Sequence, residues 1–181
     1  MSDVQLARFS DVSSQGARFA EEMGVPLGAY QKMTAEEFFL VMSSPTLGGP
    51  FATDPGISED QGLIAAIVKC SPGQGPYLHA HYNTLESFTC LSGKFRITWG
   101  DEGEHSIRLE PMDFISVPAG VYREFKNVGD DLGRLFVAIQ SPEGENKDKV
   151  IHAAAAGEEI EQRWGKDTRD AMAGIGIQFG E

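Results

Sequence analysis

Hydrophobic and polar residues alternate with a short period through the middle of this 181-residue chain. In Lys94–Trp99, the hydrophobic residues Phe95, Ile97 and Trp99 alternate with polar ones, as in a strand that buries one face. Similar short runs, separated by turns rich in Gly, Pro and Asp, are Leu63–Cys70, Tyr77–His81, Glu86–Leu91, Ser106–Leu109, Asp113–Val117, Tyr122–Asn127 and Arg134–Gln140. Many short strands with regular turns predict an all-β sandwich or barrel.

The N-terminal third shows a weaker pattern. Thr34-Ala35-Glu36-Glu37 precedes an apolar run, Phe38–Met42, and fits a capping box with Thr34 as N-cap and Glu37 at N3. It predicts a short helix that ends by Ser44-Pro45, because proline disfavours helical geometry at the preceding residue. The following stretch, 45–62, is rich in Gly and Pro and predicts a loop or a covering arm.

The C-terminal segment is polar again after Pro142. Glu158–Arg169 predicts a helix that Gly165 interrupts, and Gly174–Phe179 predicts a final strand or an ordered tail. We therefore expect one domain with three parts: an N-terminal arm with a short helix over 1–62, a barrel core over 63–141 and a C-terminal extension over 142–181.

Composition narrows the classes of partner. The formal charge of −12 argues against nucleic acid and against anionic membrane surfaces, since both need a positive protein surface. The sequence has no run of about 18 apolar residues and no signal-like N-terminus, so we expect a cytoplasmic protein. The two cysteines, Cys70 and Cys90, each lie in an apolar run and are expected to be buried thiols rather than redox or metal groups.

The strongest local signal for chemistry is His79-Ala80-His81 followed by Glu86. In an extended segment, residues i and i+2 point to the same face, so both imidazoles reach one point in space. Glu86 begins the next predicted strand, and the short turn between them can bring its carboxylate to the same point. Two imidazoles and one carboxylate suit a divalent first-row metal ion and leave coordination positions open.

The spacing around these residues resembles a known family. Gly73-x5-His79-x-His81-x4-Glu86-x6-Gly93 resembles the first motif of the cupin superfamily over its whole length, and Pro118-Ala119-Gly120 with Asn127 resembles part of the second. The resemblance implies a double-stranded β-helix, the jelly-roll or cupin barrel, with short helical additions at both ends. It also implies a metal ion held by His79, His81 and Glu86, and a homodimer.

The second motif departs from the family pattern in two places. Arg123 stands where the family has a fourth, histidine ligand, and Met112 stands where the family has a glycine. Arg123 shares strand parity with Phe125 and Asn127, so it is expected to point inward, although a strand shifted by one residue would leave it at the rim. An inward Arg123 marks either a degenerate site that repels a cation or a metal site with an added anion anchor.

Several further residues are candidates for the site. Two residues are candidates for catalysis: Tyr77, which shares parity with His79, is expected to donate a proton or a hydrogen bond, and Arg123 is expected to orient a substrate carboxylate or phenolate. Phe88 and Cys90 share parity with Glu86 and are expected to line the cavity. The other two histidines, His105 and His152, lie outside both motifs and are expected at the surface or in loops, with a fourth-ligand role as the less favoured alternative.

Two classes of function follow from these residues. The first is a metal-dependent enzyme acting on a small organic substrate, most simply a non-heme dioxygenase with Fe(II), although Mn, Ni, Zn and Cu accept the same ligands. The second is a cupin without catalysis that binds a small ligand, or a cupin isomerase or lyase. The intact ligand set favours the enzyme.

Overall fold

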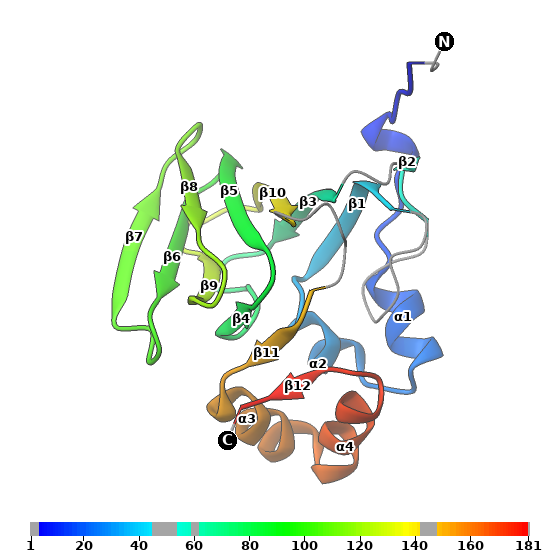
Figure 1. The fold of residues 1–181 in the computed structure, drawn as a ribbon, viewed down its shortest axis with the longest axis vertical. Coiled ribbons are helices and arrows are strands. Elements are labelled where there is room, and N and C mark those ends of the chain that lie inside the picture. Colours follow the sequence, from blue (N-terminus) through cyan, green and yellow to red (C-terminus); the bar gives the residue numbers. More distant parts are fainter. Residues whose placement is uncertain (1–3, 45–53, 59–61, 142–147, 181) are drawn as a thin grey trace.

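The computed structural model describes residues 4–44, 54–58, 62–141 and 148–180 of the chain. In chain order its elements are a 3-10 helix (Phe9–Asp11), α1 (Gly16–Glu22), α2 (Leu27–Gln31), β1 (Glu37–Ser43), β2 (Ile57–Ser58), β3 (Leu63–Cys70), β4 (His79–His81), β5 (Leu85–Ser92), β6 (Phe95–Trp99), β7 (His105–Leu109), β8 (Phe114–Val117), β9 (Tyr122–Asn127), β10 (Gly133–Gln140), β11 (Val150–His152), α3 (Ala154–Trp164), α4 (Lys166–Gly174) and β12 (Gln178–Phe179) (Figure 1). The described strands outnumber the helices and the helices are short, so the all-β prediction is confirmed.

The strands of the described residues form two sheets. One has the order β2-β1-β3-β10-β5-β8 and the other β12-β11-β4-β9-β6-β7. Consecutive strands repeatedly change sheet, as β4 and β5 do, which is the arrangement of a jelly roll. Apart from the parallel pairs β1–β2 and β11–β12, all neighbouring strands pair antiparallel.

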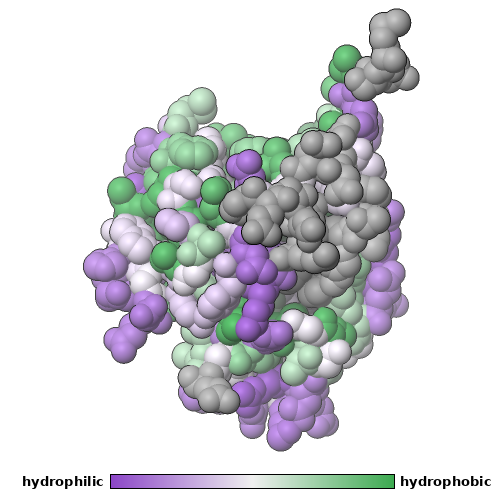
Figure 2. Space-filling view, in the orientation of Figure 1, coloured by the Kyte–Doolittle hydropathy of each residue, from purple (hydrophilic) through white to green (hydrophobic). Residues whose placement is uncertain are grey.

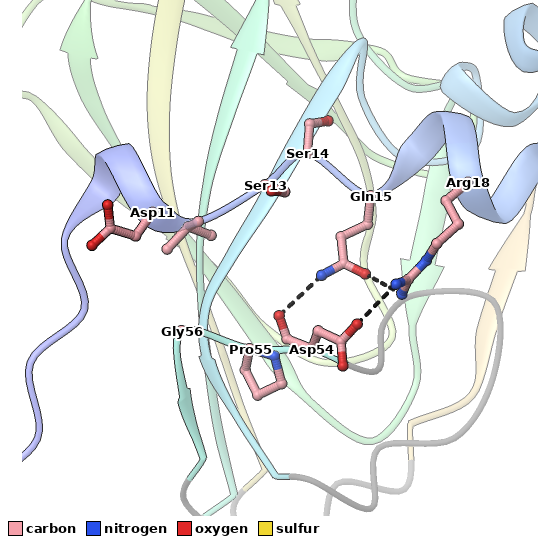
Figure 3. Close-up of a pocket in the computed structure, with 9 residues that line it drawn as sticks. Asp11, Ser13, Ser14, Gln15, Arg18, Asp54, Pro55 and Gly56 are labelled. Atoms are coloured by element: carbon pink, nitrogen blue, oxygen red, sulfur yellow. Dashed lines mark hydrogen bonds and ion pairs between the residues drawn. The ribbon is translucent and has the colours of Figure 1, made fainter.

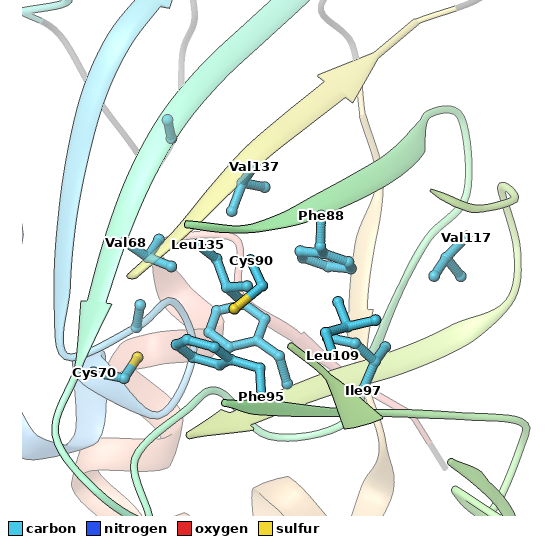
Figure 4. Close-up of a cluster of buried hydrophobic side chains, with 13 residues drawn as sticks. Val68, Cys70, Phe88, Cys90, Phe95, Ile97, Leu109, Val117, Leu135 and Val137 are labelled. Carbon is cyan, nitrogen blue, oxygen red and sulfur yellow. The ribbon is translucent and has the colours of Figure 1, made fainter. Parts of the chain in front are cut away.

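The main hydrophobic core lies between the two sheets (Figure 4). The predicted alternation in Lys94–Trp99 is confirmed at its centre, since Phe95 and Ile97 are fully buried and Arg96 is exposed. The fully buried members of the core, which share inward strand positions, are Ala66, Cys70, Phe88, Cys90, Phe95, Ile97 and Leu135. Both cysteines are buried free thiols, as predicted.

The prediction of a short helix from Thr34 is wrong, because Glu37–Ser43 forms β1, which pairs antiparallel with β3. Its apolar run alternates between faces: Leu40 is fully buried, while Phe39 lies on the opposite face under the ring of Phe9, with 5.0 Å between ring centroids. Aromatic and β-branched residues favour such pairing, and the tertiary contact outweighs the local capping signal. The predicted loop or arm over 45–62 lies largely outside the described residues, and its described part includes β2.

A second layer packs beside the barrel. Helices α2, α3 and α4 gather next to β11 and β12 (Figure 1), around a core of buried residues that includes Tyr30, Met33, Ile160, Met172 and Ile177. The outer edge of this layer is largely hydrophilic on the face shown in Figure 2. The predicted helix break is confirmed, since Gly165 separates α3 from α4 at a φ of 90°.

The C-terminal segment continues the barrel. Its strand β11 pairs with β4, so that Val150, Ile151 and His152 lie opposite His81, Ala80 and His79. Because β9 pairs with the other edge of β4, the strand that carries both motif histidines is internal to its sheet. None of the described helices has both the length and the apolar content that a membrane crossing requires.

Candidate metal centre

The three predicted ligands meet where the two sheets approach each other. His79 and His81 come from β4 in one sheet, and Glu86 comes from β5 in the other, after a turn of three residues. Their potential ligand atoms all lie within 4.8 Å of one another. Oε2 of Glu86 is 4.0 Å from Nε2 of His79 and 3.6 Å from Nε2 of His81. All three side chains are buried, and the structure brings these three predicted residues together, while their binding of a metal ion stays a prediction.

Hydrogen bonds at the far side of each ring orient the imidazoles. Nδ1 of His79 lies 2.8 Å from the carbonyl oxygen of Tyr77, and Nδ1 of His81 contacts a carboxylate oxygen of Asp148. A carbonyl and a carboxylate can only accept, so both Nδ1 atoms carry a proton and both Nε2 atoms are the ring nitrogens turned toward Glu86. Burial, together with the neighbouring His81, His152 and Arg123, holds the pKa of His79 well below its usual range and keeps it neutral.

Asp148 is a residue of the candidate site that the sequence analysis did not find. Its Oδ2 accepts hydrogen bonds from His81 and, at 2.7 Å, from the hydroxyl of Thr84, while Oδ1 accepts from the backbone N–H of Asn83 at 3.1 Å. Burial opposes ionisation of this carboxyl, but the hydrogen bond from His81 and the other donors lower the pKa of Asp148 to about 2. Since Asp148 is 67 residues from His81, no motif spacing could have indicated the pair.

Arg123 points inward, as predicted, and the alternative at the rim is wrong. It lies on β9 directly opposite His79, and its side chain is fully buried. Nε is 3.1 Å from Oε2 of Glu86, and Nη1 donates to the carbonyl of Val121 at 2.8 Å. Burial lowers the pKa of Arg123 and the carboxylates of Glu86 and Asp148 act in the opposite direction, so the guanidinium keeps its charge.

The prediction that His152 lies at the surface or in a loop is wrong, and the one for His105 is confirmed. His152 is buried on β11 with its ring centroid 5.3 Å from that of His79, while His105 is exposed. Nε2 of His152 lies 3.3 Å from the carbonyl of Met33, so its proton is directed there and the ring packs as a wall behind His79. Burial lowers the pKa of His152 to about 4, which keeps this wall uncharged.

Comparison with known proteins adds to this geometry. The family described as "Cupin domain" matches residues 66–139, which include all three candidate ligands and Arg123. Residues 66–139 are a cupin domain. The predicted double-stranded cupin barrel is thereby confirmed, and the matched segment ends before β11.

Several solved structures resemble part of the chain. The cupin domain of Schizosaccharomyces pombe Cnp3 is 20% identical with a TM-score of 0.44, and the match covers 59% of this chain and 66% of that one. A sugar phosphate isomerase of the cupin superfamily from Silicibacter pomeroyi is 18% identical with a TM-score of 0.43, and the match covers 50% of this chain and 56% of that one. An oxalate oxidase in complex with the substrate analogue glycolate is 20% identical with a TM-score of 0.43, and the match covers 50% of this chain and 46% of that one. The chain thus spans less than two thirds of each structure. A search of the curated proteins found no match.

The donor set of this cupin domain fits a divalent metal ion. Two imidazoles and one carboxylate converge through Nε2, Nε2 and Oε2, and both outer Nδ1 atoms are engaged, as is usual for metal-bound histidines. Oε2 of Glu86 is buried and forms no aligned hydrogen bond with any described residue, although Arg123 lies within ion-pair distance. A buried carboxylate oxygen left in this state is suited to a further positive partner.

The side chain of Tyr77, which the sequence analysis expected to donate a proton or a hydrogen bond at the site, points instead to the helical layer. Its hydroxyl contacts the carboxylate of Glu159 on α3 at 2.5 Å, and its ring packs against the helical core. The contact of Tyr77 with the site is its backbone carbonyl, which accepts from His79. Phe88 and Cys90, expected to line the cavity, instead belong to the hydrophobic core of the cupin barrel.

A separate hollow lies on the N-terminal side of the cupin domain (Figure 3). It is lined by the run Asp11–Gln15 and by Arg18, Asp54, Pro55 and Gly56. Its central polar groups bond one another: Arg18 donates to Asp54 and Gln15 at 2.8 Å each, and Gln15 donates to the carbonyl of Asp54 at 2.9 Å. These contacts hold the N-terminal segment against residues 54–56. The hollow is lined by none of the three candidate metal ligands.

Proposed function

We propose that the chain is a metal-dependent cupin enzyme of the non-heme dioxygenase type, acting on a small organic substrate. It would hold one divalent transition-metal ion, with Fe(II) favoured, on His79, His81 and Glu86. The observation that carries the proposal is the convergence of two Nε2 atoms on Oε2 of Glu86, with both Nδ1 atoms held by acceptors. Two histidines and one carboxylate form the facial set that leaves coordination positions open in non-heme iron oxygenases.

Each protein group has a definite part in this proposal. When bound, the ion would supply Lewis acidity and open positions for the substrate and O2. Asp148 keeps the proton of His81 on Nδ1 and fixes the ring, and the Tyr77 carbonyl does the same for His79. The buried ring of His152 excludes water from the back of His79.

A second candidate function rests on one contact. Nε of Arg123 lies 3.1 Å from Oε2 of Glu86, so the carboxylate already has a positive neighbour inside the barrel. A protein that used this ion pair in place of a metal would bind a small ligand without redox chemistry, or would catalyse an isomerisation or a lyase reaction. Metal content separates this candidate from the dioxygenase.

The test is metal analysis of the untagged protein after loading with Fe(II), Mn(II), Ni(II), Zn(II) and Cu(II) in turn. We expect about one equivalent of a transition metal in the native chain and none in the His79→Ala/His81→Ala double variant. His105→Ala serves as the matched control, because that imidazole is exposed and should leave the metal content unchanged. Oxygen consumption is then measured with aromatic and carboxylate compounds.

A native chain that takes up none of these ions would overturn the metal-dependent proposal and leave the ligand-binding candidate. A native chain that binds metal but consumes no O2 with any compound would overturn the dioxygenase assignment and favour a metal-dependent reaction without O2, such as an isomerisation or a lyase reaction.

A further inference from the structure

The guanidinium of Arg123 has donors without acceptors although it is fully buried. A guanidinium carries five N–H bonds, and the described residues satisfy it through Nη1, which donates to Val121. Nη2 has no hydrogen-bond partner among the described residues, and the only partner of Nε there is the Glu86 carboxylate, with Oε2 3.1 Å away. Buried donors are almost always paired in native proteins, so the unpaired Nη2 indicates a missing partner.

Nε and the unpaired Nη2 lie on one edge of the guanidinium. Nε and Nη2 carry parallel N–H bonds, which is the side-on edge that receives both oxygens of a carboxylate. This edge faces the candidate ligands, because Nε is 3.1 Å from Oε2 of Glu86. Glu86 approaches the edge without closing an aligned hydrogen bond, and it is also the carboxylate that lies 3.6 Å from His81. The same carboxylate therefore serves two sets of partners.

The charges of the site show what a bound metal would require. Glu86 and Arg123 form a buried ion pair, so their charges offset each other. A divalent ion adds two positive charges, of which the carboxylate of Asp148, behind His81, offsets one. A buried excess of positive charge is unfavourable unless an anion enters with it.

We propose that the Nε–Nη2 edge of Arg123 is an anion subsite and that the substrate of this cupin is a small carboxylate. The proposal rests on the metal-dependent function and names its substrate class. Metal binding draws the Glu86 carboxylate toward the two imidazoles and releases the guanidinium edge to the substrate carboxylate. Metal and anion then bind with positive coupling, and by thermodynamic linkage each strengthens the other by the same factor.

The anion subsite can be tested without metal. Glu86→Gln removes the charge that competes for Arg123 and keeps the size of the side chain. Binding of acetate and malonate to the full-length, metal-free protein is measured by calorimetry, with acetamide as the uncharged analogue of acetate. We expect metal-free Glu86→Gln to bind acetate at least tenfold more tightly than the metal-free native chain, and acetamide to bind neither.

Two double variants test the role of Arg123. Glu86→Gln/Arg123→Gln should lose the gained affinity, whereas Glu86→Gln/Arg96→Gln should retain it, because Arg96 is exposed on β6. Circular dichroism checks the fold of each variant, and Glu86→Ala replaces Glu86→Gln if the latter does not fold. The native chain titrated with Co(II) in the presence and absence of malonate supplies a measurement that needs no variant at position 86, and positive coupling is expected.

The outcomes separate the two proposals. Acetate binding that is equal in the native and Glu86→Gln chains, or that survives loss of Arg123, overturns the anion subsite even if Co(II) binds. In a chain that does bind Co(II), absence of coupling between Co(II) and malonate overturns it as well. Tight, Arg123-dependent acetate binding in a chain that takes up no Co(II) supports the subsite and overturns the metal-dependent function.

Discussion

Replacement of Asp148 by Asn tests how far the C-terminal segment controls the candidate metal centre. The Asp148 side chain is 16% exposed and acts only as an acceptor: Oδ2 faces His81 and Thr84, and Oδ1 faces the backbone N–H groups of Asn83 and Lys149. An asparagine can keep its oxygen toward the two backbone donors. Its NH2 group then faces Nδ1 of His81, and two donors oppose each other.

The imidazole of His81 relieves this conflict by changing its tautomer. Nδ1 becomes the acceptor, and the proton moves to Nε2, which is the atom turned toward Glu86. A metal ion then has to displace that proton before it can bind. Loss of such an outer partner commonly weakens metal binding by about 10- to 100-fold, or about 1.4–2.7 kcal/mol. We expect Asp148→Asn to fall in this range while the chain remains folded.

The assay is a Zn(II) or Co(II) titration in competition with a chelator of known affinity. Asp170→Asn is the matched control, because that aspartate pairs with Lys166 on the exposed face of α4. Imidazole 15N chemical shifts of His81 report the tautomer directly. A metal affinity within twofold of the native value, or a His81 proton that stays on Nδ1 in the variant, would refute the reasoning.

Two further predictions concern stability and reactivity. Met112 is exposed and has a φ of 77°, a left-handed conformation that costs a residue with a side chain about 1–2 kcal/mol. Met112→Gly should therefore raise the free energy of unfolding, measured by urea denaturation, by about 0.5–1 kcal/mol. A lower free energy of unfolding would show that the Met112 side chain contributes packing. Cys70 and Cys90 are fully buried, and burial raises the pKa of the Cys70 thiol to about 11. Both thiols should therefore react with alkylating reagents only when the chain unfolds. Rapid labelling of the native protein at neutral pH would contradict the described core.

The barrel strands could be predicted from the sequence because each carries its own signal. Leu63–Cys70 and Tyr122–Asn127 form strands with the predicted bounds, since an alternating or apolar run is closed at each end by turn residues. The segment after Thr34 could not be assigned, because its capping signal is local while its pairing with β3 is a tertiary contact. The positive φ at Met112 agrees with the glycine that the family pattern places there.

The candidate site could be predicted only as far as local spacing reaches. His79, His81 and Glu86 lie within eight consecutive residues, and strand parity places Arg123 inward. Parity failed for Tyr77 because β4 begins at His79, so the alternation does not extend to residue 77. The places of Asp148 and His152 depend on the register between β11 and β4, which no motif records. Homodimerisation and the identity of the metal stay predictions.

The internal position of β4 has a consequence for how this protein can be divided. Two residue pairs, His79–Arg123 and Ala80–Tyr122, join β4 to β9, and three more join it to β11. A fragment cut at the family boundaries would leave the histidine strand at a sheet edge, with unpaired backbone groups and without Asp148. The segment that comparison recognises is therefore smaller than the unit that must fold together. Transplanting residues 66–139 into another protein would move the three candidate ligands without β11 and Asp148, which position the histidine strand and the His81 ring.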